Sequence, residues 1–320
     1  MRKTEKFDFY NPTMLKSYNL DEQIRYQLKM LDGMDVFTRR HCENVANITC
    51  RLCENLHMSK GFTVYATTCA YLHDVGKLFI PPEILQKPGK LTPEEYEIMK
   101  THTTIGYQIC MKDLKLRPYA AGALYHHEAL NGTGYPNGLA GNEIPYEAQI
   151  IRVADEYEAI TSKRQYKTHI GIIDTLKILI ENAQPDKATS FKDAFIKSLK
   201  PEMHFGKIDK KILKALFKVV IDDTEYEIAS RSDYLEFLES EIKRLKKAYV
   251  YFHKMIACKE GTEKHEYYKA GVKMYLYSNE DPYKVDQMIE EFKATYKNRE
   301  ETIQKLYLEV KEIKKLSVNP

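Results

Sequence analysis

The chain has 320 residues, of which 43% are hydrophobic, and this is enough to bury the core of one large domain or of two ordinary ones. Its 49 basic and 46 acidic residues are spread along the sequence and leave a formal charge of only +3. We therefore do not expect a surface dedicated to a nucleic-acid polymer. No uninterrupted run of about 18 apolar residues occurs, so the sequence predicts no membrane span.

Six cysteines lie mostly within apolar helical patterns, and no charged and then apolar leader precedes them. We expect reduced thiols in a cytoplasmic protein. Cys50 and Cys53 form a CxxC motif inside one predicted helix, but no second CxxC completes a set of thiolate ligands. We interpret these two cysteines as core residues rather than as a zinc or redox site.

Residues 1–19 are expected to form a short lead, and a helical pattern starts at Leu20. Within residues 35–57, apolar residues recur at steps of three and four, and His41 is in register with them. This places His41 on the buried face of a helix. A single histidine in such a position is most often an ordinary core residue, so its interpretation as a metal ligand depends on the partners that follow.

His73 and Asp74 are adjacent near the end of a helix predicted over residues 63–79. An imidazole and a carboxylate cannot by themselves hold a catalytic metal, so they need partners from elsewhere. Lys77 follows Asp74 by about one helical turn, where its ammonium could neutralise a phosphate oxygen or assist a leaving oxygen. The alternative is a solvated lysine at a helix end.

The start of another helix is marked by Thr92, Pro93 and Glu95. A threonine N-cap, a proline at the first helical position and a glutamate three residues after the cap form a capping box. The helix that begins there is expected to point His102 inward.

His126 and His127 end a further helix, predicted over residues 119–130. Adjacent histidines in the middle of a helix point about 100° apart, but near its end both can reach one target. The loop at residues 131–138 has three glycines, which adopt backbone conformations that other residues resist. A plain surface turn is the alternative, but the neighbouring double histidine favours a place in the site for this loop and its Tyr135.

Asp155 follows several apolar residues in a helix predicted over residues 148–162. An acid in such surroundings is costly to bury without a partner, so it requires a cation. Arg164 and Lys167 come directly after this helix, where their basic groups could hold phosphates.

The last hundred residues have a different pattern. Apolar residues step by three and four along residues 235–256 and again along residues 285–313, with a shorter helix around residues 267–277 between these two seams. We expect residues 223–320 to form a C-terminal helical hairpin or coiled-coil region. It would pack on the catalytic domain, on a second copy of the chain as a homodimer, or on a partner protein.

The candidate ligands are imidazoles and carboxylates, which suit iron, manganese, cobalt, nickel or zinc better than calcium or magnesium. Seven such groups exceed what one ion needs. We expect two divalent ions about 3.5–4 Å apart, bridged by Asp74 and by a water or hydroxide that attacks phosphorus, as in many phosphate-ester hydrolases. The seven groups belong to His41, His73, Asp74, His102, His126, His127 and Asp155.

These features, in this order, resemble the HD-GYP branch of the HD phosphohydrolases. The resemblance covers residues 20–222 and rests on His41, His73-Asp74 with Gly76-Lys77, His102, His126-His127-Glu128, Gly134-Tyr135-Pro136, Asp155 and Arg164-Gln165-Tyr166-Lys167. It implies an all-α fold with an HD-type helical bundle, a non-haem centre of iron or manganese held by the seven groups, and hydrolysis of cyclic di-GMP to pGpG and often on to GMP. It also implies catalytic roles for Asp74 and Lys77, and substrate contacts from Lys77, Tyr135, Arg164 and Lys167.

The sequence departs from the family at four positions. Phe37 stands where some members carry a glutamate that supports a third metal, so a binuclear centre is expected. Asn131, Gln149 and Glu158 stand where an aspartate, an arginine and an aspartate are common. None removes a ligand, but they leave the substrate open. Two other hypotheses therefore stand beside the first: a hydrolase of another cyclic dinucleotide, such as cyclic GMP-AMP, or of a mononucleotide; and a signalling scaffold that binds the messenger or a partner protein.

Overall fold

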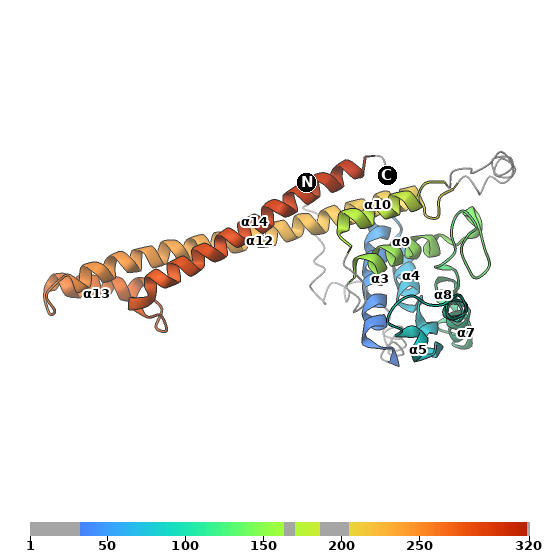
Figure 1. Cartoon of the computed structure of the whole chain (residues 1–320), viewed down its shortest axis with the longest axis horizontal. Helices are drawn as coiled ribbons and strands as arrows, with labels where there is room; N and C mark the ends of the chain where they lie inside the picture. Colours follow the sequence, from blue (N-terminus) through green and yellow to red (C-terminus); the bar gives the residue numbers. More distant parts are fainter. Residues whose placement is uncertain (1–32, 163–169, 186–204, 319–320) are drawn as a thin grey trace. The chain divides into compact units, whose positions relative to one another are not determined.

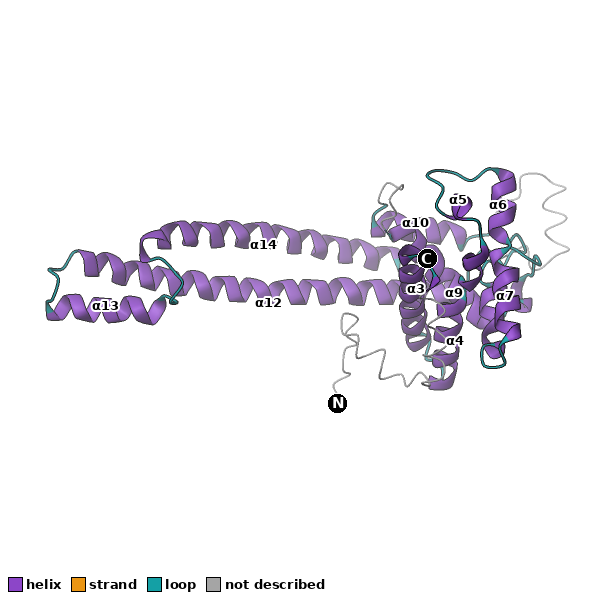
Figure 2. Cartoon of the chain, turned by 90° about the horizontal axis from the view of Figure 1, so that it is seen from below, coloured by secondary structure: helices purple, strands orange, loops and turns teal. Residues whose placement is uncertain are grey.

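The computed structural model describes residues 33–162, 170–185 and 205–318, and every named element in these ranges is helical (Figure 2). This confirms the predicted all-α fold class. The α-helices are α3 Val36–Asn55, α4 Lys60–Leu72, α5 Pro82–Leu85, α6 Pro93–Lys100, α7 His102–Lys112, α8 Ala120–Tyr125, α9 Tyr146–Thr161, α10 Ile172–Asn182, α12 Lys210–Ile256, α13 Glu263–Tyr275 and α14 Val285–Leu316. The 3₁₀ helices are η2 Val75–Phe79, η3 Arg117–Tyr119, η4 Gly141–Glu143 and η6 Pro282–Lys284.

Contacts within the chain divide it into two compact units, residues 1–220 with 316–320 and residues 221–315. In the first unit, α3 packs against α4 and α9, and α7 packs against α8 and η2 (Figure 1). These packed helices surround the candidate site. The lead predicted over residues 1–19 lies outside the described residues.

Helix α3 begins where Asp35 caps it. The Asp35 carboxylate accepts hydrogen bonds from the backbone N–H groups of Phe37 and Thr38, both at 3.0 Å. His41 lies on the buried stripe of this helix, as the three- and four-residue spacing predicts, and is only 5% exposed. The helix therefore carries an imidazole into the interior of the first unit.

The helix predicted over residues 63–79 is interrupted just before its polar pair. α4 ends at Leu72, and Asp74 has non-helical backbone angles, φ −101° and ψ 8°, before η2 begins. The imidazole of His73 donates from Nδ1 to the carbonyl of Ala70 at 2.6 Å. A continuing α-helix would use that carbonyl for the backbone N–H of Asp74. The pair therefore lies just past a helix end.

Gly76 lets η2 approach α7 very closely. A Cβ atom at this position would lie 1.9 Å from the carbonyl oxygen of His102, so a larger residue would force the two segments apart. This approach brings Asp74, two residues earlier, next to the first turn of α7.

The predicted capping box is present at the start of α6. Glu95 donates its backbone N–H to the Thr92 hydroxyl at 3.3 Å, and Thr92 donates its own N–H to the Glu95 carboxylate at 2.7 Å. The helix does not continue through His102, however. α6 ends at Lys100 and α7 starts two residues later, because the His102 imidazole donates to the carbonyl of Met99 at 2.6 Å at this junction.

The helix that precedes the double histidine is shorter than predicted. α8 ends at Tyr125, and His126 and His127 follow it rather than belonging to it. The Nδ1 atom of His126 lies 3.0 Å from the carbonyls of Gly122 and Ala123, which occupies the backbone acceptors of the last turn. Both histidines thereby escape the divergence that a regular helix would impose.

Helix α12 runs unbroken over Lys210–Ile256, so the change of pattern near residue 222 does not end a helix. The whole stretch has no glycine or proline, and its apolar stripe stays in phase with helical geometry. Its first turns bury four large apolar side chains within the first unit: Ile212, Leu213, Leu216 and Phe217.

The second unit contains two long helices that run side by side (Figures 1 and 2). Ile228, early in α12, packs with Val310 near the end of α14, whereas Leu245 packs with Val285 at the start of α14. The two helices are therefore antiparallel, as the two apolar seams predict. The shorter α13 lies between them in the chain.

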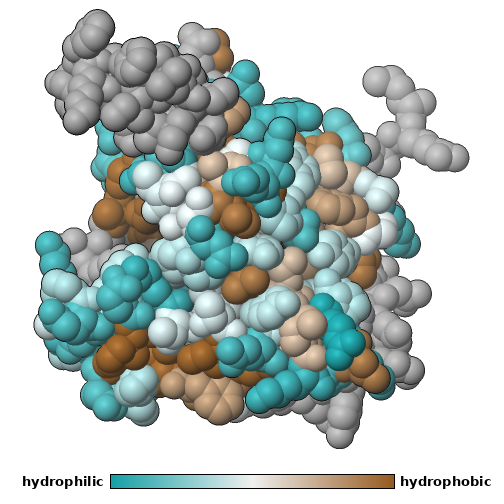
Figure 3. Space-filling view, turned by 90° about the vertical axis from the view of Figure 1, so that its right-hand side faces the viewer, coloured by the Kyte–Doolittle hydropathy of each residue, from teal (hydrophilic) through white to brown (hydrophobic). Residues whose placement is uncertain are grey.

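No helix in the described part of the chain is both long and apolar enough to cross a bilayer. All six cysteines are free, and only Cys258 is not buried. The face of the molecule in Figure 3 has brown apolar patches separated by hydrophilic residues rather than one continuous apolar surface.

Candidate metal centre

Three imidazoles of the first unit are fixed by the same local contact. His73, His102 and His126 lie at helix ends or junctions, and each donates Nδ1–H to the backbone carbonyl three residues earlier, at 2.6, 2.6 and 3.0 Å. Carbonyls near a helix end lack partners within the helix, so these bonds satisfy the backbone and orient the rings. With the proton on Nδ1, Nε2 of each neutral ring keeps the lone pair that a metal needs.

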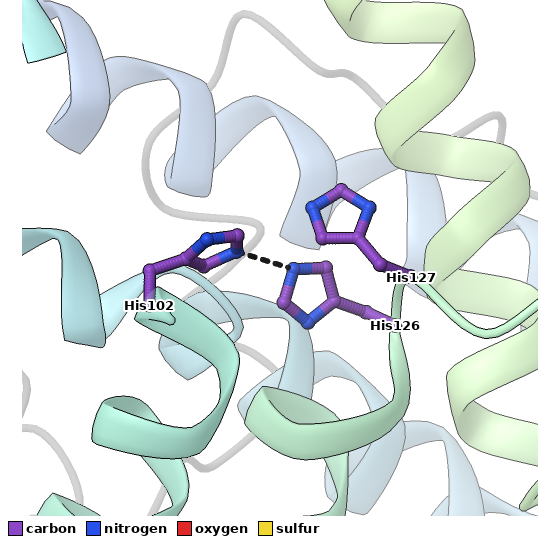
Figure 4. Close-up of side chains that lie close together, drawn as sticks. All are labelled: His102, His126 and His127. Atoms are coloured by element: carbon purple, nitrogen blue, oxygen red, sulfur yellow. Dashed lines mark hydrogen bonds between the residues drawn. The ribbon is translucent and has the colours of Figure 1, made fainter. Parts of the chain in front are cut away.

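The first cluster consists of His102, His126 and His127, whose ring nitrogens come together as a metal site would require (Figure 4). The Nε2 atoms of His102 and His126 are 3.2 Å apart. Because Nδ1 of both rings already donates to a carbonyl, the Nε2 lone pairs of the two neutral rings face each other. A cation between these two atoms would bind both lone pairs. Burial lowers the pKa of His102 to about 4 and that of His126 well below its usual value. A proton is thus a poor occupant, and a metal ion fits.

The second cluster consists of His41, His73 and Asp155. Nε2 of His41 lies 3.0 Å from Oδ1 of Asp155. Nε2 of His73 is fully buried and makes no hydrogen bond in the described part of the chain. A buried polar atom without a partner costs free energy. A bound cation would supply that partner.

Asp74 lies between the two clusters and is 1% exposed. Its Oδ1 is 3.3 Å from Nε2 of His102 and 3.9 Å from Nε2 of His126. Its Oδ2 is 3.3 Å from Nε2 of His73 and 3.5 Å from Nε2 of His41. Each carboxylate oxygen therefore faces a different cluster, which is the arrangement of a carboxylate that bridges two ions.

Both buried carboxylates are held in the ionised form. Burial alone would raise the pKa of Asp74, but the nearby Lys77 ammonium and the surrounding histidines keep it well below its usual value. Burial is likewise outweighed at Asp155, where the hydrogen bond and charge of His41 lower the pKa. At His41, burial opposes the charged form, but Asp155 and Glu158 raise the pKa to about 9. Two anions at the centre of a buried site favour a cation between them.

A thiol also lies at the edge of the site. Cys42 forms a third group with His73 and Asp74. Burial raises the pKa of this thiol well above its usual value, and a protonated thiol is a poor ligand. The available donors are therefore nitrogen and oxygen, a set that suits transition metals.

Two of the predicted substrate contacts lie beside the clusters. Lys77 donates from Nζ to Oδ2 of Asp74 at 2.5 Å, and its side chain is 16% exposed, so it is not a solvated lysine. The Tyr135 ring stacks on His127 with centroids 4.7 Å apart and planes at 26°. Arg164 and Lys167 lie outside the described residues.

Glu158 is a part of the site that sequence reasoning missed. It is 5% exposed; one carboxylate oxygen accepts from Nδ1 of His41, and the other accepts from the Asn44 amide at 2.9 Å. A carboxylate on the outer nitrogen of a metal-binding histidine orients the ring and raises its basicity. The available signal was register, because Glu158 follows Asp155 by three residues on the same face of α9.

Glu128 fixes the glycine-rich loop, a role that the sequence pattern does not indicate. It is 1% exposed, and its two oxygens accept hydrogen bonds from the backbone N–H groups of Asn137 at 2.7 Å and Leu139 at 2.9 Å. Gly134 packs so closely that a Cβ there would lie 2.5 Å from Cα of Glu128. These contacts hold Tyr135 in place, so the loop is more than a surface turn.

Comparisons with known proteins identify the family of the chain. A family model described as HD domain matches residues 25–188, just over half of the chain. Similar proteins include a cyclic di-GMP phosphodiesterase of Thermotoga maritima, 47% identical over 135 residues, and the cyclic di-GMP phosphodiesterase response regulator RpfG of Xanthomonas campestris pv. campestris, 38% identical over 141 residues. A third is 3'3'-cGAMP-specific phosphodiesterase 3 of Vibrio cholerae, 36% identical over 154 residues.

These three matches cover 42%, 43% and 48% of this chain, and 37%, 37% and 34% of the respective relatives. The shared segment is thus little more than a third of each relative's length. The residues that the family model matches contain both clusters. From the family match and the clusters together, the chain belongs to the HD domain family and to its HD-GYP group, whose members depend on metal ions.

Proposed function

We propose that the chain is a metal-dependent phosphodiesterase that hydrolyses cyclic di-GMP to pGpG, to GMP or to both. The observation that carries this proposal is the position of Asp74, whose two oxygens face two separate clusters of nitrogen and oxygen donors. Relatives named as cyclic di-GMP phosphodiesterases support the substrate class.

Two divalent transition-metal ions fit the donors, with iron or manganese preferred and zinc, cobalt or nickel as alternatives. Each cluster would hold one ion, and Asp74 would bind both. Ions bound in this way polarise a phosphodiester and lower the pKa of water.

The residues around the clusters have distinct parts in this proposal. The Lys77 ammonium, which donates to Asp74 in the structure, would donate instead to a non-bridging phosphate oxygen of the substrate and stabilise the negative charge on that oxygen. Tyr135, stacked on His127, offers a ring face beside the first cluster on which a guanine base can stack. Arg164 and Lys167 stay proposed phosphate contacts on the resemblance alone.

Cyclic GMP-AMP is the second candidate substrate, because three relatives are named as specific for 3'3'-cGAMP. The family departures at Asn131 and Gln149 do not decide between the two. The Asn131 side chain accepts hydrogen bonds from Thr133, and the Gln149 amide donates to the carbonyl of Ile144 at 2.9 Å. Both side chains thus have structural partners within their own segments.

We also propose the division into a phosphohydrolase domain, residues 20–222, and a C-terminal helical hairpin, residues 223–320. Association of these helices with a second copy or a partner protein stays a prediction.

Product analysis on protein of known metal content tests the proposal. Protein purified without oxygen is subjected to elemental analysis and then incubated separately with cyclic di-GMP and cyclic GMP-AMP. We expect about two ions per chain and conversion of cyclic di-GMP to pGpG, GMP or both. Loaded protein that yields no product from cyclic di-GMP would contradict the proposal, and turnover of cyclic GMP-AMP alone would support the second candidate.

The scaffold hypothesis makes a different prediction for Asp74→Ala. If this variant loses metal and hydrolysis but the cellular phenotype is intact, the protein acts by binding rather than by catalysis. If the phenotype is lost together with hydrolysis, the enzyme hypothesis holds.

A further inference from the structure

We propose that Lys100 and Tyr96, at the end of α6, form a second subsite for the cyclic dinucleotide. While one phosphate lies at the metal centre, this subsite would bind the other phosphate and one of the two bases. This inference rests on the proposed function and assigns to two further residues a part in substrate binding.

The subsite is defined by one cation and two aromatic rings. Nζ of Lys100 lies 5.4 Å from the centroid of the Tyr96 ring and 5.7 Å from that of Tyr135. The two rings are 6.4 Å apart at an angle of 78°. Because Tyr135 also stacks on His127, it connects this group directly to the first cluster. The Lys100 ammonium and the partly exposed Tyr96 ring therefore lie one aromatic ring away from the proposed metal site.

The position of the subsite is fixed by the same bonds that fix the metal cluster. The His102 imidazole donates to the carbonyl of Met99, the residue before Lys100, at 2.6 Å. At the other end of α6, Lys87 donates from Nζ to the Glu95 carboxylate at 2.5 and 2.7 Å. Helix α6 is thus held at both ends, and Lys100 cannot move far from the first cluster.

Both groups are available to a ligand. Lys100 pairs with Glu97 at 2.6 Å, but the Glu97 side chain is 69% exposed, and such surface pairs are weak. A phosphate would therefore displace Glu97 readily and gain a charge-assisted bond. Tyr96 is 47% exposed although its ring is large and partly apolar, so it offers a face on which a base can stack.

The chemistry of the substrate requires such a subsite. A cyclic dinucleotide has two phosphodiester groups that close a ring of two riboses, and each ribose carries one base. When one phosphate lies at the metal centre, the other must lie close by and needs a cation, and its base needs a surface. A simpler reason for Lys100 is that a cation stabilises the C-terminus of a helix. That role predicts an effect on folding and none on the choice of substrate.

Kinetics with two substrates separate these possibilities. Lys100→Gln in the full chain, loaded with manganese, is assayed with cyclic di-GMP and with bis(p-nitrophenyl) phosphate, which has a single phosphodiester and no second phosphate. We expect KM for cyclic di-GMP to rise by about tenfold or more, and the loss in kcat/KM to be about tenfold larger for cyclic di-GMP than for the simple diester. Equal losses on both substrates, or no loss on either, would overturn the inference.

Tyr96 is tested by a pair of variants. Tyr96→Ala removes the ring and is expected to raise KM for cyclic di-GMP by about tenfold, whereas Tyr96→Phe keeps the ring and is expected to stay within about threefold. Equal effects of the two variants would exclude stacking. Lys112→Gln is the matched control, because Lys112 is exposed at the opposite end of α7, about 15 Å along the helix from His102. Thermal unfolding and elemental analysis of every variant check folding and metal content.

A binding measurement keeps this inference separate from the proposed function. The affinity of wild type and Lys100→Gln for a hydrolysis-resistant phosphorothioate analogue of cyclic di-GMP is measured by calorimetry. If the wild type binds the analogue and Lys100→Gln binds at least about tenfold more weakly, the subsite stands even where no hydrolysis is found. If both bind with equal affinity, or neither binds, the inference fails.

Discussion

Glu158→Gln removes one negative charge from beside the second cluster and leaves the size of the side chain almost unchanged. In the wild type, one oxygen of Glu158 accepts from Nδ1 of His41, and the other accepts from the Asn44 amide at 2.9 Å. Glutamine has only one oxygen acceptor, and its amide nitrogen can only donate. Either His41 or Asn44 would then face a second donor, so the imidazole loses its partner or its orientation.

The expected loss follows from the part that this carboxylate plays. The Glu158 carboxylate stabilises both a proton and a metal ion on the His41 ring. It stabilises the metal ion more, because the metal ion carries two positive charges and the proton carries one. Loss of such an orienting partner typically lowers metal affinity by about 10- to 100-fold, or about 1.4–2.8 kcal/mol. We expect this loss for the ion of the second cluster. The first cluster should keep its ion, because His102 and His126 retain their backbone partners.

Equilibrium dialysis against manganese, followed by elemental analysis, measures how many ions are bound at each free concentration. Wild type should bind two, and Glu158→Gln should bind one at concentrations that fill both wild-type sites. Glu43→Gln is the control, because it removes an α3 carboxylate that pairs with Arg39 only at the surface. If Glu158→Gln binds both ions as tightly as wild type, or loses both in parallel, the assignment of Glu158 to one cluster is wrong.

Three other sites and the domain division give further predictions. Asp74→Asn removes the charge between the clusters and should lower kcat by at least about 100-fold with loss of bound metal; full metal content in elemental analysis would contradict this. Metal binding near pH 7.5 should release about one proton, because the pKa of His41 is about 9 without metal and the bound ring must be neutral. Calorimetry in two buffers of different ionisation enthalpy measures that proton, and identical heats would exclude it. Gly76→Ala places a Cβ 1.9 Å from the carbonyl oxygen of His102 and should lower the free energy of unfolding by about 1–3 kcal/mol in urea titrations, whereas an unchanged midpoint would refute the close packing. A fragment of residues 1–222 should fold and bind metal; an insoluble or metal-free fragment would show that the hairpin belongs to the core.

Much of the site can be predicted from the sequence because residue type and buried position carry its chemistry. His41 and Asp155 fall on apolar stripes of predicted helices, and the structure buries both. A polar group in such a position needs a partner. The sequence indicates this need but does not show which residue the partner is. Their convergence over more than a hundred positions was expected only from the order of the motifs and their resemblance to a family.

The ends of the helices could not be predicted in the same way. The apolar pattern continues through residue 79, yet α4 ends at Leu72 because the His73 imidazole takes the Ala70 carbonyl. Gly76 then has to meet α7, a contact between segments that no local pattern describes. The apolar pattern likewise predicts that His126 and His127 lie within a helix, whereas they follow the end of α8. The prediction that both rings reach one target does not depend on where this helix ends.

Partners that are distant in the sequence were missed. Glu158 lies 117 positions from His41, and its replacement of the usual aspartate looked like a departure rather than a functional residue. Lys100 and Tyr96 looked like an ordinary exposed helix end, because their relation to Tyr135 exists only in the folded chain. The domain boundary expected between residues 222 and 223 does not coincide with a helix end, because α12 runs through it without a break.

We propose above that Asp74 joins two metal ions, one in each cluster. Crystals of manganese-loaded protein, with diffraction measured at the manganese absorption edge, test it most directly. We expect two anomalous peaks, one against each cluster, with the Asp74 carboxylate in contact with both. A single peak, or peaks that lie away from Asp74, would contradict it.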